Sequence, residues 1–324
     1  IKTMRSFFEE IRRDEMEKAV AELAVKWGAD FIRDSDGTEL STELKNLGYK
    51  IYSTVCIVRA DQQWPKTHSD ELPRKFLMTN RATAKSKILD IPLMDRYFDQ
   101  KYEIDTTSRP EKYWEVIDRT TGKGVKQSDW KFLSGRGVVR VRNAEPSHQY
   151  TVNFMVKQIW DSTSMYNHIT NKWTCEHIMS ADPYFPATYR HLMDYFDKWL
   201  VSHPETEVVR LTTLAYHFTI DAGPGGGTVY RDWLGYTDTI TPPALEDFAR
   251  ENGYRLRSED IVDQGYYNAT DRVPSRRYLD WMNFIHRFVV KFGKDLVQRA
   301  HRAGRKTAIF WGDHWIGVEP YSPL

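Results

Sequence analysis

The sequence has little cysteine, no long apolar run and no excess of one charge. Its two cysteines, Cys56 and Cys175, have neither the spacing of a metal site nor the number that a disulfide framework needs. We therefore expect a reducing, cytoplasmic location. No run of about 18 apolar residues is present, so we predict no transmembrane segment and no membrane partner.

Charge of either sign is nearly balanced, with 46 Lys and Arg against 45 Asp and Glu and a formal net charge of +1. A nucleic-acid-binding face needs clustered positive charge, so we predict no nucleic-acid partner. The histidines show no metal-ligand spacing, which predicts no metal site. No Gly-x-Gly-x-x-Gly follows a strand, which removes the main sign of a dinucleotide-binding fold.

Aromatic residues, by contrast, are abundant at 14%, with 11 tryptophans. Large rings fill hydrophobic cores, and exposed rings offer flat surfaces on which sugars stack. Composition alone leaves both uses open.

The order of expected elements predicts an α/β fold. A helix over residues 7–26 ends at Gly28. Strands are then expected at 29–34, 51–58, 150–160, 208–214 and 307–311, with helices at 192–200 and 279–303, the last ended by Gly304. This alternation favours a (β/α)8 TIM-like barrel, incomplete in this chain, over a doubly wound sheet. Period-2 patterns and hairpin turns between 113 and 142 predict a small antiparallel β insertion at about 103–148.

Three charged residues, Arg33, Arg210 and Asp313, fall within or just after apolar strands. A charge there is costly to bury unless it is paired, so structural ion pairs are one explanation. An active site is the other explanation, because barrel enzymes keep their reactive residues at the carboxyl ends of the strands. The occurrence of all three in such positions favours an active site over structural ion pairs.

The surroundings of Asp313 suit a proton donor. Trp311, His314 and Trp315 flank it, and an apolar, aromatic neighbourhood raises the pKa of a carboxyl group so that it keeps a proton near neutral pH. Two arginine forks suit a phosphate, whose oxygens they bind bidentately. One acid, two arginines and several indoles fit the phosphorolysis of a glycoside.

A glycoside hydrolase would instead need a second carboxylate facing the first. Spacing excludes none of four candidates, namely Asp34, Asp161, Asp232 and Glu319. The glycine-rich segment 223–228 lacks the Lys and Ser/Thr of a phosphate-binding loop, and we expect a surface loop or lid there.

Six segments, spread in order along the chain, resemble one family. They are Gly28–Thr38, Tyr113–Gly122, Met165–Asn171, Val208–Thr213, Asp232–Gly235 and Gly312–Tyr321. The family is that of the 1,3-β-galactosyl-N-acetylhexosamine phosphorylases, which act on lacto-N-biose and galacto-N-biose and form glycoside hydrolase family 112.

The resemblance implies a hexosyltransferase-type disaccharide phosphorylase with inverting chemistry. Phosphate would attack the anomeric carbon of galactose, giving α-D-galactose 1-phosphate and the free acceptor sugar. The family's general acid falls on Asp313 and its phosphate-binding arginines on Arg33 and Arg210. Asn167 and Trp233 fall on sugar-contacting positions.

Further expectations follow from the same resemblance. Trp315 joins the sugar-binding set, and Thr163 falls at a position where family members differ. Phosphate is a co-substrate, and no metal or organic cofactor is implied. Because family members are roughly twice as long, we expect residues 1–324 to be the N-terminal part of the barrel domain, with later domains absent from the chain.

Several alternatives stay open at this point. The acceptor can be N-acetylglucosamine, N-acetylgalactosamine or, as in the galactosyl-rhamnose phosphorylases, rhamnose. An inverting or retaining β-galactosidase on a similar barrel is the second enzyme class. A galactoside-binding module without turnover is the non-enzyme alternative, and a homodimer is the one protein partner considered.

Overall fold

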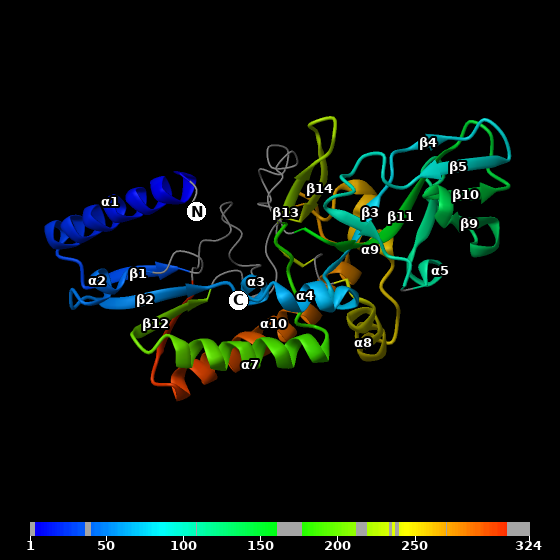
Figure 1. Cartoon of the computed structure of the whole chain (residues 1–324). Coiled ribbons are helices and arrows are strands. Elements are labelled where there is room, and N and C mark those ends of the chain that lie inside the picture. The colour runs from blue at the N-terminus through cyan, green and yellow to red at the C-terminus, as the bar shows by residue number, and fades with distance from the viewer. Residues whose placement is uncertain are drawn as a thin grey trace. The chain divides into compact units, whose positions relative to one another are not determined.

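A computed structural model of the chain describes residues 4–35, 40–107, 109–160, 177–211, 219–232, 235–236, 240–269 and 271–309 (Figure 1). The chain divides into two compact units. Unit 1 comprises residues 1–60, 192–214 and 293–310, and unit 2 comprises 61–191, 215–292 and 311–324. Within the described ranges, none of the helices combines the length and the hydrophobicity that crossing a bilayer requires.

Unit 1 is built on a four-stranded sheet whose strands all run parallel. Its strands are β1 (Phe31–Ser35), β2 (Lys50–Val55), β12 (Thr206–Leu211) and β15 (Lys306–Ile309). They lie side by side in the order in which the chain makes them. Figure 1 shows the first three, β1, β2 and β12, next to one another. Parallel neighbours in chain order are the arrangement of barrel strands. The predicted α/β class is confirmed, and the described residues form an open sheet rather than a closed barrel.

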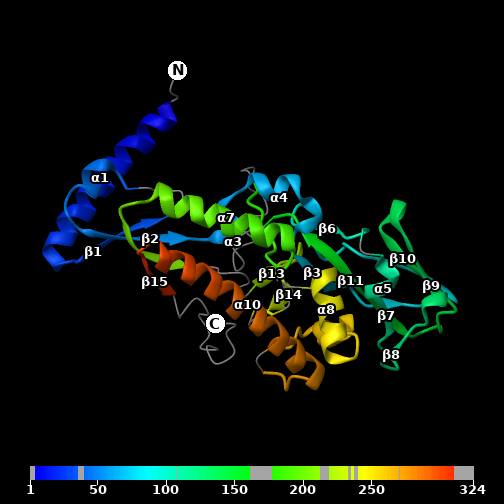
Figure 2. The same cartoon turned by 90° about the horizontal axis from the view of Figure 1, so that it is seen from below.

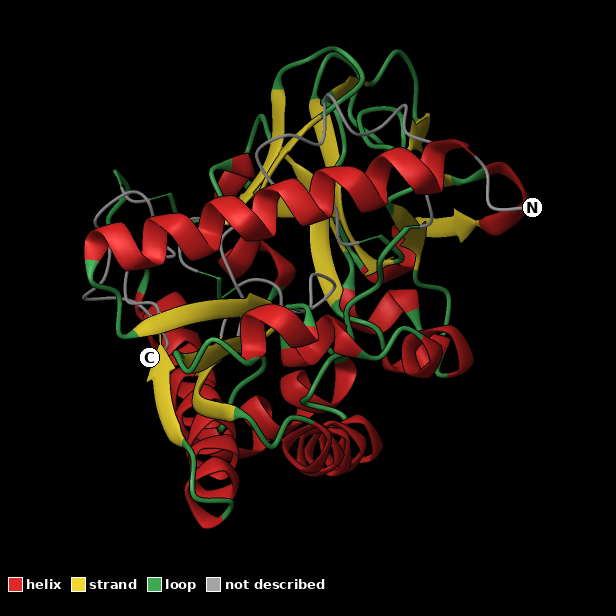
Figure 3. Ribbon diagram, turned by 60° about the vertical axis from the view of Figure 1, so that its left-hand side comes forward, coloured by secondary structure: helices red, strands yellow, loops and turns green. Residues whose placement is uncertain are grey.

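Two helices of unit 1, α1 (Met4–Trp27) and α2 (Thr42–Lys45), pack on this sheet through apolar side chains. A third helix of unit 1 is α3 (Ile57–Ala60), and Figure 3 shows α1 as one continuous helix leading into β1. Ala24 of α1 and Leu44 of α2 form a core cluster with Ile32 and Ile51 of the first two strands. The predicted helix end at Gly28 is confirmed, with φ at 63°, which glycine adopts without strain.

Two long helices, α7 (Pro186–Ser202) and α10 (Arg276–Arg302), contribute their last turns to unit 1. They run side by side (Figure 2), and Arg299 of α10 forms an ion pair with Asp197 of α7. The helix predicted at 279–303 is confirmed by the bounds of α10. Gly304, with φ at 75°, follows its end. The strand predicted at 51–58 is shorter than expected, because α3 begins at Ile57.

Unit 2 contains antiparallel sheets. The central strand β11 (Gln149–Gln158) pairs with β3 (Arg74–Met78), β4 (Ala82–Thr83), β6 (Tyr102–Ile104) and β7 (Glu115–Asp118), and β7 pairs with β8 (Lys123–Gly124). A second sheet has the order β5 (Ile88–Pro92), β10 (Val138–Arg142), β9 (Trp130–Leu133). Its remaining helical elements are short except for α8: α4 (Gln63–Thr67), η1 (Ser69–Glu71), α5 (Pro110–Tyr113), η2 (Gln127–Asp129), η3 (Ser134–Arg136), α8 (Pro242–Asn252), α9 (Ser258–Val262) and η5 (Asp263–Gly265).

The antiparallel region is wider than the sequence indicated. Its strands extend from Arg74 to Gln158 rather than over about 103–148, and the strand expected at 150–160 belongs to it. β11 is buried along almost its whole length, from Tyr150 to Gln158. A strand covered on both faces lacks the period-2 pattern that identifies most antiparallel strands, so its sequence resembles that of a barrel strand.

The glycine-rich segment closes a hairpin between β13 (Thr219–Ala222) and β14 (Thr228–Asp232). The amide of Gly223 donates a hydrogen bond to the carbonyl of Gly227, with N and O 2.9 Å apart. A Cβ at Gly223 would lie only 2.5 Å from the carbonyl oxygen of Arg96. The expected loop is confirmed, and its first glycine is required by this close approach.

Buried ion pairs join the two chain segments of unit 2, 61–191 and 215–292. Lys101 pairs with Asp221, and both side chains are almost fully buried. Arg119 of the first segment pairs with Glu259 of the second through both nitrogens of its fork, at 2.5 and 2.9 Å. Burying such charges is favourable only when each is paired and fully hydrogen-bonded.

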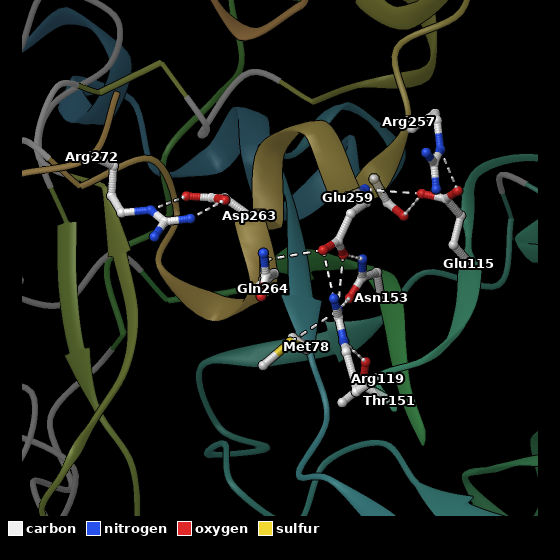
Figure 4. A network of polar contacts seen from close by, with 11 residues as sticks. Met78, Glu115, Arg119, Thr151, Asn153, Arg257, Glu259, Asp263, Gln264 and Arg272 are labelled. Atoms are coloured by element: carbon white, nitrogen blue, oxygen red, sulfur yellow. Dashed lines mark hydrogen bonds and ion pairs between the residues drawn. The ribbon is translucent and has the colours of Figure 1, made fainter. Parts of the chain in front are cut away.

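The Arg119–Glu259 pair is the centre of a wider network, drawn in Figure 4. Arg119 Nε donates to Thr151 Oγ1 at 2.7 Å, and Asn153 Nδ2 donates to Glu259 Oε2 at 2.6 Å. Next to it, Glu115 accepts from the backbone amide of Glu259 at 2.9 Å. The start of α9 is thereby fastened to β7 and β11.

We predict that Arg119→Met destabilises the protein by about 3–5 kcal/mol, because it leaves the carboxylate of Glu259 in a largely buried position without its cation. Urea unfolding measures the change. Arg250→Ala is the control, since its pair with Asp247 is exposed and should contribute less than about 1 kcal/mol. If both variants lower the free energy of unfolding equally, the network contributes no more to stability than an exposed ion pair does.

Candidate functional site

The register of the parallel sheet places Arg33 and Arg210 on one face. Arg33 is paired with Tyr52 across β1 and β2, and Thr54 is paired with Arg210 across β2 and β12. Paired residues project from the same face of a sheet, and so do residues two apart on one strand. The four side chains therefore share a face.

This face is the one opposite to α1. Ile32 and Ile51, the neighbours of Arg33 and Tyr52 in sequence, pack against Ala24 of α1. Alternation along each strand turns Arg33 and Tyr52 the other way. The two arginines therefore lie on the face of the sheet that α1 does not cover, and in a complete barrel this face would be the inner one.

The two predicted phosphate-binding arginines differ in exposure. Arg33 is the third of five residues in β1 and is exposed, and Arg210 is the fifth of six in β12 and is half-buried. Arg210 Nη1 donates a long hydrogen bond of 3.4 Å to Thr54 Oγ1. Two guanidinium groups on one face are suited to an oxyanion, which accepts two parallel hydrogen bonds from each fork.

Two of the four candidate second carboxylates can be placed. Asp34 is buried and accepts a hydrogen bond from the backbone amide of Leu40 at 3.1 Å, and alternation puts it on the opposite face from Arg33. Asp232 ends β14, is buried, and accepts from the backbone amide of Gly235 at 2.8 Å. Asp34 therefore does not share the face of Arg33 and Arg210, and Asp232 belongs to the β13–β14 hairpin of unit 2. Asp161 and Glu319 lie outside the described residues.

The other predicted site residues also lie outside the described residues: Asp313, Asn167, Thr163, Trp233 and Trp315. Of the predicted set, the structure thus places the two arginines on one face of the sheet. The roles assigned to all of these residues stay predictions. Within the described ranges no three His, Cys, Asp or Glu side chains are grouped as a metal site would require.

Sequence analysis missed Tyr52 and Thr54. Both lie on the face of the arginines, Tyr52 half-buried and Thr54 buried. The alternation of residues along 51–55 was a signal for them, but it was weak because β2 is rich in β-branched and aromatic residues on both faces. Only the pairing of β2 with both β1 and β12 shows that these two side chains share a face with Arg33 and Arg210.

Chain order links unit 2 to the same strands. Its segment 61–191 follows the end of β2 at Val55, and its segment 215–292 follows the end of β12 at Leu211. Both segments are thus connections that leave the carboxyl ends of parallel strands, and in barrels those connections carry the active site. Asn167 and Thr163 belong to the first segment and Trp233 to the second.

Comparison with known proteins shows that the chain is similar to a family of phosphorylases. The family model of the lacto-N-biose phosphorylase N-terminal TIM barrel domain matches residues 11–324. The chain is 44% identical over 93% of its length to a 1,3-β-galactosyl-N-acetylhexosamine phosphorylase of Bifidobacterium longum subsp. longum, covering 40% of that protein. It is 41% identical over 94% of its length to a D-galactosyl-β-1→4-L-rhamnose phosphorylase of Lachnoclostridium phytofermentans, covering 42% of that protein. A 1,3-β-galactosyl-N-acetylhexosamine phosphorylase of the latter organism is 38% identical over 95% of the chain. The chain spans about two fifths of the length of these relatives.

Proposed function

Because the chain belongs to the lacto-N-biose phosphorylase family, we propose that the protein carrying it cleaves a β-galactosyl disaccharide with inorganic phosphate. The products are α-D-galactose 1-phosphate and the free acceptor sugar. The observation that carries this proposal is the shared face of Arg33 and Arg210. Two guanidinium groups on one face of a sheet are suited to an oxyanion such as phosphate. The similarity to several phosphorylases over more than nine tenths of the chain supports it.

The proposed reaction is a single displacement. A phosphate oxygen forms a bond to the anomeric carbon from the face opposite the glycosidic oxygen, and the carbon–oxygen bond to the acceptor breaks. Asp313 donates its proton to the departing oxygen, which leaves as a hydroxyl of the free sugar. Inversion turns the β-linkage into an α-phosphate. Phosphate occupies the role that a second carboxylate has in a hydrolase, so a single acid suffices.

Electrostatics explains why two arginines are needed. Phosphate carries up to two negative charges and must approach the electron-rich ring oxygens of a sugar. Guanidinium groups remain charged at any physiological pH and hold the anion in a fixed orientation. Arg33 and Arg210 thus orient the nucleophile, and Asn167, Trp233 and Trp315 hold the sugars.

The proposal has two versions, which differ in the acceptor sugar: an N-acetylhexosamine or rhamnose. Relatives named for N-acetylhexosamine and for rhamnose are similarly close to the chain. We favour an N-acetylhexosamine, because the amide of Asn167 can pair with an acetamido group through both its oxygen and its nitrogen. A galactosyl-rhamnose phosphorylase is the second candidate.

The proposal needs no metal or organic cofactor, since phosphate and Asp313 perform both reactive roles. With only two cysteines, a cytoplasmic location remains our proposal. We also propose that the protein has no nucleic-acid partner and no membrane partner. A homodimer can be tested by light scattering on the purified protein.

We predict that Asp313→Asn lowers turnover about 10²–10⁴-fold while the fold is kept, because the amide cannot protonate the leaving oxygen. The loss should be much smaller with an aryl galactoside whose leaving group departs without a proton. Circular dichroism checks the fold. An equal loss with both substrates would contradict the assignment of Asp313 as the acid.

Arg210→Ala should weaken the apparent affinity for phosphate by about 1.5–3 kcal/mol, the usual range for a hydrogen bond to a charged group. The KM for the disaccharide should change much less. Arg140→Ala is the control, because it removes an ion pair with Asp90 in unit 2, at 2.7 Å. If phosphate dependence is unchanged while stability falls, Arg210 is a structural residue.

Thr163→Val is predicted to change the ratio of the phosphorolysis rates of galacto-N-biose and lacto-N-biose. The two acceptors differ at the 4-position, and a site that hydrogen-bonds a sugar hydroxyl discriminates more sharply than an apolar wall. The comparison uses both disaccharides at equal concentration. An unchanged ratio would mean that Thr163 takes no part in acceptor choice.

A further inference from the structure

We infer that Tyr52 is a further phosphate-binding residue, whose hydroxyl donates a hydrogen bond to the anion that Arg33 and Arg210 hold. This rests on the proposed function and extends it to a residue between the two arginines. The strand β2 lies between β1 and β12, so its inward side chains lie between those of the other two strands.

The geometry of the sheet brings the two arginines over β2. Neighbouring strands lie about 4.8 Å apart, so Arg33 and Arg210 start about 9.6 Å apart across the sheet. They are offset by two residues along it, because Arg33 shares a row with Tyr52 and Arg210 a row with Thr54. Each arginine has a long flexible side chain. An anion bound by both therefore lies above β2, over Tyr52 and Thr54.

The two β2 side chains are engaged differently. Thr54 is buried, and its hydroxyl accepts from Arg210 Nη1, which orients the guanidinium group. Tyr52 is half-buried, and its hydroxyl makes no hydrogen bond to any part of the chain that the structure describes. A bound oxyanion would supply an acceptor at this position.

Phosphate has room for this additional donor. Its oxygens together accept more hydrogen bonds than two arginine forks provide, and a phenol adds a donor without adding charge. A ring in the row of Arg33 also displaces water below the anion, which strengthens the charged hydrogen bonds above it. Tyr52 would thus act on phosphate and leave the acceptor sugar unaffected.

The test is Tyr52→Phe in the protein that carries this chain, which removes only the hydroxyl oxygen. We expect the apparent KM for inorganic phosphate to rise about 10- to 100-fold, as for a lost hydrogen bond to an anion. The KM for the disaccharide should stay within about twofold, and phosphate should protect the variant less against thermal unfolding. Tyr49→Phe is the matched control, because Tyr49 packs on the other side, against the α1 core cluster.

Two outcomes would overturn the inference. An unchanged phosphate KM in Tyr52→Phe would mean that the ring only fills the barrel interior. A raised disaccharide KM with an unchanged phosphate KM would make Tyr52 a sugar contact. A failure of the proposed function looks different: the wild type would then release galactose without phosphate and show no phosphate KM at all. An unchanged phosphate KM in Arg33→Ala and Arg210→Ala, measured in parallel, would mean that phosphate binds elsewhere and would also overturn the inference.

Discussion

The parallel pairing of β1, β2 and β12 is the constraint on which the candidate site depends. Side chains alternate between the faces of a strand, so a register fixes which residues share a face. A slip of one residue in β12 would carry Arg210 to the face packed by helices, away from Arg33. The observed register instead places Arg33, Tyr52, Thr54 and Arg210 on the face of the sheet opposite to α1. Hydrophobic residues on the opposite face, such as Ile32 and Val209, hold that register in place.

The long connections after β2 and β12 form a folded unit of their own, and charged pairs join them. Lys101–Asp221 and Arg119–Glu259 each link one connection to the other. Such pairs contribute little net stability, but they are costly when one partner is lost. They therefore favour one arrangement of the two connections over others. This matters because the predicted sugar-binding residues Asn167 and Trp233 belong to different connections.

The elements with strong local signals could be predicted from the sequence. The ends of α1 and α10 follow from Gly28 and Gly304, and the strand around Arg210 follows from its β-branched residues. Pairing could not be predicted, since it depends on residues far apart in the chain. β11 resembled a barrel strand because it is buried throughout, and Lys101–Asp221 joins residues 120 positions apart. The arginines were found by their charge, whereas Tyr52 has a side chain common in any strand.

The most direct test of phosphorolysis is to incubate the protein with a β-1,3-galactosyl-N-acetylhexosamine, with and without inorganic phosphate, and to follow the products by NMR. The account predicts α-D-galactose 1-phosphate and free acceptor sugar when phosphate is present, and no cleavage without it. Release of free galactose at the same rate in the absence of phosphate would show a hydrolase and contradict the account. Binding of the disaccharide with no cleavage in either condition would show a galactoside-binding protein instead.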